Sequence, residues 1–354
     1  MPRSHRISFS LLSVPTLDPA SEARRQIYLK FVLMRTRRIR KLRQAVSIGL
    51  LALTPALTGC LVHRHSVLKT HPPDVVLNAT LDQLLRQVDE RYAAIHTMTA
   101  FVQVTACTGG ASKGEVKCYS PFSGNIIIGK PQQINVILKL PLLGSRAIDM
   151  VSDGKTFKML ISLNNCAIIG SDVVTNTSQK GLYSLRPAVI LDSLLMHGKE
   201  PDQVVSMTQD SRDVPNPKKR KDIINEPDYD IDFLSQPENQ VARTLHVIHI
   251  SRVDLLPYRQ DIYNAEGKVE TQAFYSNYQK FGDINFPSKI EIQRPLDELD
   301  LTIVLVKKTS FNQKLPDDQF DLGPIPASYT IQNMDDPVSA STNPCAAHAP
   351  QSTR

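Results

Sequence analysis

Apolar residues recur at every second position along several segments, and this period of two is the feature that most limits the folds open to the chain. Val102, Val104 and Ala106 alternate with polar residues, and the apolar positions of 134–140 do the same. Successive side chains on a strand point to opposite faces, so the alternation predicts half-buried strands. Further strands are predicted at 157–161, 245–250, 269–278, 289–293 and 301–306. Short turns between them predict an antiparallel meander of about ten strands.

Two segments have the spacing of helices instead. The residues from Thr80 to Gln83 form a capping-box pattern, and apolar residues follow at intervals of three and four up to Ile95. A second helix is predicted from Pro187, a favoured first residue, to Gly198, a favoured residue just past a helix end. The fold class is therefore α+β. A sheet of this size can curl, and helices over it enclose either an apolar cavity or an ordinary filled core.

The region before residue 60 has the layout of an export signal. A cationic stretch begins at Arg35, and an apolar run from Ala45 to Leu57 follows it; this run is shorter than the roughly 20 residues of a membrane-spanning helix. The segment Leu57-Thr58-Gly59-Cys60 resembles the lipobox of bacterial lipoproteins, which implies acyl chains on Cys60 and stable anchoring to a membrane. The alternative is an ordinary signal peptide with a cysteine near its end. Met34, directly before the cationic stretch, is the predicted start.

The basic character of the chain comes from this leader. Residues 1–59 hold eleven Lys and Arg against two acidic residues, a net charge of +9, while the whole chain has +6. The remainder is therefore at −3, which removes the support for a nucleic-acid partner. Four regions are predicted: a leader at 1–59, a lipid-anchored tether at 60–77, a folded domain at 78–327 and a disordered tail at 328–354. Residues 210–240 are polar, and the basic run Lys218 to Lys221 within them is predicted to be a solvated loop rather than a nuclear-import or phosphate-binding patch.

Residue patterns that carry chemistry are few. Cys107 and Cys118 flank a Gly-rich turn, so they either form a disulfide across a hairpin or are two small buried thiols. The sequence Gly110-Ala111-Ser112-Lys113-Gly114 matches the nucleophile elbow of serine hydrolases, but a predicted strand follows it where that motif needs a helix. His246 and His249 are three residues apart on a predicted strand and should point to opposite faces, which argues against a metal site. No catalytic residue, metal ligand or noncovalent cofactor is predicted, and the chain is not expected to be an enzyme.

Several short motifs, taken in order, resemble the Lol superfamily of lipoprotein carriers, and most closely its LolB-type outer-membrane receptors. The resemblance covers roughly residues 80–325. The motifs are Phe101 to Ala106, Phe122 to Ile126, Leu140 to Ser145, Ser152 to Phe157, Arg186-Pro187, Phe286 to Ile290 and Leu315 to Leu322. The resemblance implies an incomplete antiparallel β-barrel of about ten or eleven strands, covered by helices, with an apolar cavity for acyl chains. The expected cavity lining is Val136, Leu138, Ile148, Phe157, Met159, Ile190 and Leu194.

The same resemblance gives a role to the loop Pro141-Leu142-Leu143-Gly144-Ser145. LolB-type receptors carry a protruding Pro-Leu-Gly-Ser loop whose leucine reaches toward the membrane, so Leu142 or Leu143 is the candidate for delivering cargo. The alternative is an ordinary turn with both leucines folded into the core. This chain also has an insertion near 210–240 and no tryptophan.

These features together predict an outer-membrane lipoprotein that faces the periplasm, is lipid-anchored through Cys60 and binds acyl chains in lipoprotein or lipid transfer. Leu61, the residue after Cys60, is not Asp, so the usual inner-membrane retention signal is absent. The expected partners are membrane lipid and lipoprotein acyl chains or a periplasmic LolA-type carrier, and a monomer is expected. The competing hypothesis is an assembly lipoprotein that uses the same fold, with a filled core, to bind a protein partner. A serine hydrolase is a distant third.

Overall fold

The computed structural model describes residues 69–111, 114–172, 185–216, 218–219, 222–306, 308–321, 323–336 and 345. The chain divides into two units, Met1–Leu68 and Lys69–Arg354, and every described residue lies in the second. The predicted lipobox, the lipidation of Cys60 and the start at Met34 therefore lie outside the described residues. Within the described part, no helix is both long enough and apolar enough to span a membrane.

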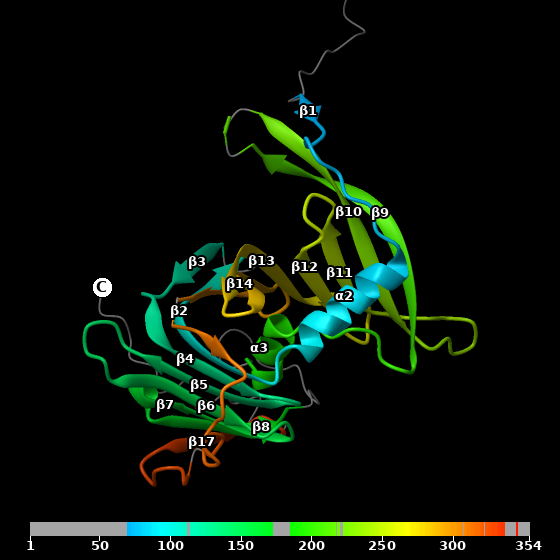
Figure 1. Ribbon diagram of the computed structural model, residues 1–354. Helices are drawn as coiled ribbons and strands as arrows, with labels where there is room; N and C mark the ends of the chain where they lie inside the picture. Colours follow the sequence, from blue (N-terminus) through cyan, green and yellow to red (C-terminus); the bar gives the residue numbers. More distant parts are fainter. Residues whose placement is uncertain are drawn as a thin grey trace, which may run out of the picture. The chain divides into compact units, whose positions relative to one another are not determined.

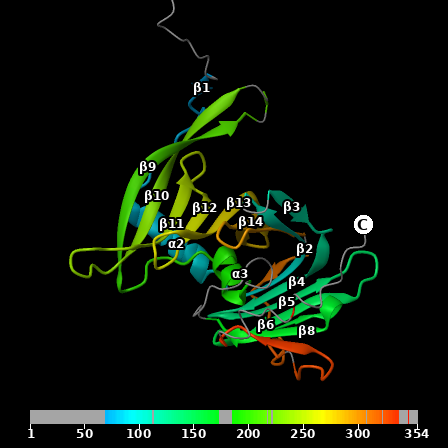
Figure 2. The same ribbon diagram turned by 180° about the vertical axis from the view of Figure 1, so that it is seen from behind.

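One large sheet forms the body of the second unit (Figures 1 and 2). The described residues contribute 17 strands to it. In chain order the strands are β1 Thr70–His71, β2 Thr97–Gly110, β3 Glu115–Cys118, β4 Phe122–Gly129, β5 Gln133–Lys139, β6 Arg146–Ser152, β7 Thr156–Ile161, β8 Cys166–Ser171, β9 Gln203–Pro215, β10 Ile223–Ser235, β11 Thr244–Ser251, β12 Pro257–Tyr263, β13 Val269–Phe281, β14 Ile284–Arg294, β15 Leu299–Leu305, β16 Ser310–Phe311 and β17 Thr330–Asn333.

Strands that are adjacent in the sheet are mostly adjacent in the sequence. From β9 to β15 each strand pairs antiparallel with the next. β15 then pairs with β2, β2 with β4, and the strands from β4 to β8 follow in order. β1 on β10 and β17 on β8 are parallel pairs. Among the described residues β9 and β17 do not pair with each other, so the sheet is open.

The open, mainly antiparallel sheet with two helices agrees with the prediction, but the predicted ten or eleven strands are too few. β1, β3, β16 and β17 have only two to four residues each, which is too short for a period of two to be recognised. No strand is predicted within 210–240, where β9 and β10 form a long hairpin that is paired along its whole length. Lys218 and Lys219, of the basic run that is predicted to be a solvated loop, are exposed between these two strands. Main-chain pairing does not depend on side-chain polarity, so a largely polar strand such as β9 is easily missed.

Helix α2, Leu81–Ala93, begins with the predicted capping box. The Thr80 hydroxyl accepts a hydrogen bond from the Gln83 N–H at 3.3 Å, and Gln83 Oε1 accepts one from the Thr80 N–H at 2.8 Å. These bonds satisfy two N–H groups at the start of the helix. Leu84 and Val88 on the apolar face are buried in a cluster with residues of β10 and β11, namely Tyr229, Ile231, Phe233, Ile248 and Ile250.

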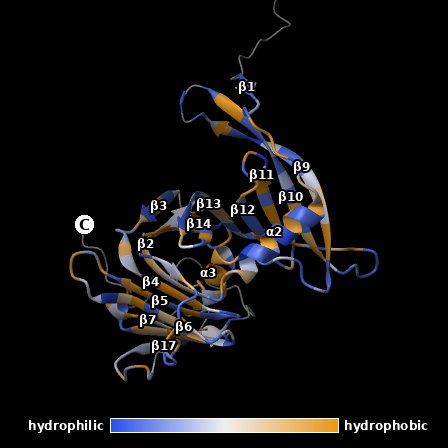
Figure 3. Cartoon of the chain, in the orientation of Figure 1, coloured by the Kyte–Doolittle hydropathy of each residue, from blue (hydrophilic) through white to orange (hydrophobic). Residues whose placement is uncertain are grey.

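Helix α3, Pro187–Leu194, starts at the predicted residue but ends before Gly198. The main chain becomes extended at Leu195, with φ −117° and ψ 92°. Gly198 lies three residues beyond the C-cap, Leu195, and therefore does not cap the helix; the Asp89 carboxylate of α2 lies beside it. Figure 3 shows α3 and the strand β4 mainly in hydrophobic colours, and both belong to the larger of two buried apolar clusters.

Two predicted irregular segments are partly ordered. β1 lies within the predicted tether 60–77, and the Leu77 N–H donates to the Arg252 carbonyl at 2.6 Å. β17 lies within the predicted disordered tail 328–354, and a disulfide joins Cys345 to Cys166 at the start of β8. Parallel pairing and a covalent cross-link fix these segments although their composition is polar.

Candidate binding pocket

The side chains predicted to line a cavity lie in the core of the sheet. Val136, Leu138, Ile148, Phe157 and Met159 are between 1% and 8% exposed, and Ile190 and Leu194 of α3 are similarly buried. Leu194 is also part of the lining of the pocket described below. A period of two identifies which face of a strand is buried, but it does not reveal whether the space above that face is empty.

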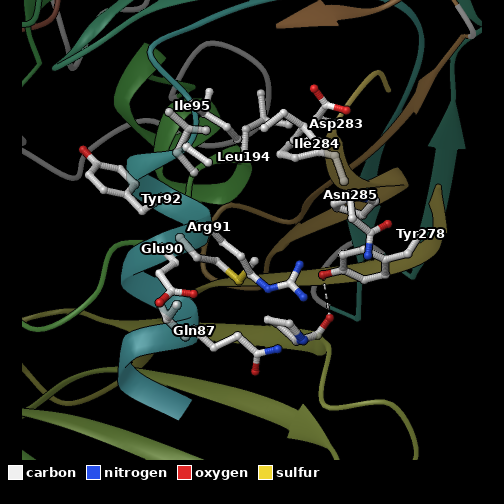
Figure 4. A pocket seen from close by; sticks show the side chains of 17 residues that line it. Gln87, Glu90, Arg91, Tyr92, Ile95, Leu194, Tyr278, Asp283, Ile284 and Asn285 are labelled. Atoms are coloured by element: carbon white, nitrogen blue, oxygen red, sulfur yellow. Dashed lines mark hydrogen bonds between the residues drawn. The ribbon is translucent and has the colours of Figure 1, made fainter. Parts of the chain in front are cut away.

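A pocket of about 340 Å³ opens between α2, the segment that follows α3, and the start of β14 (Figure 4). α2 and its C-cap contribute residues between Gln87 and Ile95, and the segment after α3 contributes residues 194–196. Residues 283–287 form the opposite wall, with Pro257 and Tyr278 beside them. The volume lies at the lower end of the range of about 300–1,000 Å³ that small-molecule sites occupy.

The walls of the pocket are mostly apolar. Ile95, Leu194, Leu195 and Phe286 are each at most 5% exposed, so they are held in place by the core behind them. Met196 and Ile284 are partly exposed and complete the apolar surface. A wall fixed by packing keeps its shape without a ligand, and removal of apolar atoms from water inside it contributes about 25 cal/mol per Å².

Two tyrosines sit in the pocket wall as neutral groups. The Tyr278 hydroxyl donates to the Pro257 carbonyl at 2.8 Å, and burial raises the pKa of Tyr278 well above its ordinary value. Burial, followed by the charges of Asp192 and Glu200, raises the pKa of Tyr92. The Lys130 ammonium lies 3.4 Å from the centre of the Tyr92 ring, and burial lowers the pKa of that lysine.

Arg91, in the last turn of α2, is the cation of the pocket lining. Its Nε is buried and has no hydrogen-bond partner in the part of the chain that the structure describes. Figure 4 shows the side chain extending from α2 into the pocket, with the guanidinium directed toward Tyr278. Sequence reasoning missed Arg91, although its position three residues after the buried Val88 places it beside the apolar face of the predicted helix.

The loop between β5 and β6 exposes both leucines of the predicted delivery motif. Leu142 has no burial at all, with a relative exposure of 106%, and Leu143 is 78% exposed. Leu142 adopts φ 67° and Gly144 φ 66°, a left-handed conformation that is uncommon for a leucine. The Leu140 N–H donates to the Ser145 carbonyl at 2.9 Å and so closes the loop. The alternative, with both leucines folded into the core, is not what the structure has.

The Gly-rich turn lies between two antiparallel strands. β2 and β3 pair through residues 107–110 and 115–118, and a disulfide joins the facing residues Cys107 and Cys118. The turn is therefore strand to strand, whereas a nucleophile elbow leads from a strand into a helix. Ser112 itself lies outside the described residues.

His246 and His249 lie on opposite faces of β11. His246 stacks on Phe233, with ring centroids 4.1 Å apart, and burial lowers its pKa to about 4. His249 Nδ1 lies 2.6 Å from Asp230 Oδ1, and its Nε2 lies 3.5 Å from Asp261 Oδ2. Burial alone would lower the pKa of His249, but the hydrogen bond to Asp230 and the charge of both carboxylates raise it to about 9.

Comparisons with known proteins give only distant similarities. A family model described only as "Uncharacterized protein" matches residues 208–324, which is less than half of the chain. No curated protein matches. Among solved structures, a DUF1329 family protein from Desulfovibrio piger has 11% identity and a TM-score of 0.45, with 69% of this chain and 96% of that chain covered.

Two further solved structures have similar coverage. A LolA superfamily protein from Nitrosomonas europaea has 12% identity and a TM-score of 0.41, over 69% of this chain and 98% of that one. A putative outer membrane lipoprotein-sorting protein domain from Vibrio parahaemolyticus has 9% identity and a TM-score of 0.39, over 68% and 94%. All three TM-scores are below 0.5, so these similarities do not by themselves establish a common fold.

Proposed function

We propose that this chain is a lipid-anchored protein of the outer membrane, facing the periplasm, that binds an acyl chain in the pocket beside α2 and acts in lipoprotein or lipid transfer. The observation that carries the proposal is the pocket itself, an open space of about 340 Å³ whose walls are largely apolar and partly held by buried side chains. Anchoring through Cys60 and the outer-membrane location rest on the lipobox-like sequence.

Energetics support transfer without an energy source at this step. Each methylene removed from water is worth about 0.8 kcal/mol, so a chain that moves between two comparably apolar sites changes its free energy little. A carrier of this kind needs a pocket that is open. The pocket beside α2 is open, and partly exposed residues such as Met196 and Ile284 line it.

The exposed leucine loop supplies a contact with a bilayer. The free energy of an exposed aliphatic side chain falls when it enters an apolar phase, by about 1.5–3 kcal/mol for a leucine that becomes fully buried. Leu142 and Leu143 are adjacent and both exposed, so together they form a small apolar tip. In this proposal the tip inserts into the membrane while the pocket releases its chain.

The binding test uses the full chain with Cys60→Ala, which lacks the thiol for lipid attachment. A fluorescent fatty acid is titrated into this protein and then displaced by unlabelled palmitate. We expect saturable binding that Ile284→Glu abolishes, because a carboxylate in the pocket wall is costly to desolvate. Val116→Glu is the matched control, since Val116 is 61% exposed and lies on β3, outside the pocket lining. Equal binding by both variants, or none by the parent, would contradict the proposal.

The loop is tested separately by lipid transfer between donor and acceptor vesicles. Leu142→Glu with Leu143→Glu should slow transfer and leave fatty-acid binding unchanged, because neither leucine lines the pocket. Unchanged transfer by this double variant would remove the loop from the mechanism.

The second candidate is an assembly protein that binds a protein partner. It is favoured by the dense packing of the sheet interior, where the seven residues predicted to line a cavity belong to one buried apolar cluster. A purified chain that takes up no fatty acid but retains a specific protein partner on crosslinking in membranes would support this alternative.

A further inference from the structure

Arg91 has an unusual environment for a cation near an apolar surface. Its Nε is desolvated without an acceptor, and no carboxylate in the described ranges forms an ion pair with it. Its place in the last turn of α2 is favourable for the helix dipole, but that effect does not require the side chain to enter the pocket. A buried donor without a partner is unfavourable.

The other described polar groups of the pocket do not accept a hydrogen bond from Arg91 Nε. The Tyr278 hydroxyl already donates to Pro257. Figure 4 places Asp283 beside Ile284 at one end of the pocket, and Glu90 beside Gln87 on the helix side. The Arg91 side chain, by contrast, extends into the space between these ends, toward Tyr278. Among the described residues that line the pocket, Arg91 is therefore the one cation, beside apolar side chains and the carboxylates Glu90 and Asp283.

We infer that the ligand of this pocket is an amphiphile with a single acyl chain and an anionic head, either a carboxylate or a phosphate, whose oxygens pair with Arg91. A guanidinium presents parallel N–H donors that match both kinds of head group, and such charge-assisted bonds are stronger than neutral ones. The inference rests on the proposed acyl-chain binding and adds the chemistry of the head. The apolar wall supplies affinity for the tail, and Arg91 selects the charged end.

The test compares ligands of one chain length that differ only in the head: a fatty acid, an alkyl phosphate and the uncharged fatty alcohol. They are measured by displacement of a fluorescent fatty acid and, independently, by native mass spectrometry, on the Cys60→Ala chain and on Arg91→Gln, Arg91→Lys and Arg86→Gln variants. Arg86 is the matched control because it is an exposed arginine on the same helix and does not line the pocket. Circular dichroism of each variant verifies that it is folded.

We expect Arg91→Gln to weaken binding of an anionic ligand by about tenfold or more, the loss of one charge-assisted hydrogen bond, and to leave the alcohol unchanged. Arg91→Lys should retain most of the affinity, and Arg86→Gln all of it. The ratio of fatty-acid to alkyl-phosphate affinity distinguishes the two heads. The inference fails if the alcohol binds as well as the anions and Arg91→Gln changes no affinity. In that case the aliphatic part of Arg91 only covers the pocket, and the proposed acyl-chain binding still holds. If no ligand binds, the proposed function itself fails.

Discussion

The two histidines of β11 should make the free energy of unfolding depend on pH in opposite directions, with His249 stabilising the fold at low pH and His246 at high pH. His249 is 14% exposed and lies between Asp230 and Asp261, which raise its pKa from 6.5 to about 9. The folded state therefore binds the His249 proton more tightly than the unfolded state does. The contribution of protonated His249 to the free energy of unfolding is fully present below pH 6.5 and is lost as the pH rises through 9. At about 1.4 kcal/mol per pKa unit, the full contribution is about 3 kcal/mol.

His246 works in the other direction. Burial against Phe233 lowers its pKa to about 4, so the folded state holds the neutral ring. Its contribution is present above pH 6.5 and is lost as the pH falls toward 4, again by about 3 kcal/mol.

The assay is urea unfolding of the full Cys60→Ala chain at pH values from 4.5 to 10, for the parent and for the His249→Gln and His246→Gln variants. The free energy of unfolding of the parent should fall more steeply than that of His249→Gln between pH 6.5 and 10, and more steeply than that of His246→Gln below pH 6.5. His96→Gln, at an exposed histidine, is the control for a change of histidine as such. Parallel curves for the parent and His249→Gln across the alkaline range would refute the argument from the two carboxylates.

Three further substitutions test the fold itself. Thr80→Ala should lower the free energy of unfolding by about 1 kcal/mol because it removes the helix cap, and Thr80→Ser should restore it; urea unfolding measures both. Cys166→Ser should cost about 2–5 kcal/mol because it opens a cross-link that spans 179 residues, and limited proteolysis should then cleave the chain near Cys345 first. Gly124→Ala should destabilise by at least about 1–3 kcal/mol because its Cβ would collide with the main chain of β5, whereas Gly110→Ala, with only ordinary contacts, should change the thermal midpoint little.

Elements with strong local patterns were predictable from the sequence. The capping box at Thr80, the apolar face of α2 and the start of α3 at Pro187 depend on neighbouring residues, so local sequence determines them. The hairpin of β9 and β10 was not predictable in this way. Its two strands are joined by main-chain pairing, and the side-chain pattern of neither strand identifies its partner.

The same distinction explains why the buried residues of the sheet were identified and the pocket was not. The alternation around Val136 and Met159 marks a buried face, and both side chains are indeed buried. A pocket, however, exists only where packing is incomplete, and this one is bounded by Arg91, Leu195 and Ile284, which lie far apart in the sequence. No local pattern connects these three positions. Of these three residues, Arg91 alone has a position that the sequence marks, because it is a cation beside the apolar face of a predicted helix. Such a cation is typical of a surface residue, and only the opposite wall of the pocket distinguishes the two cases.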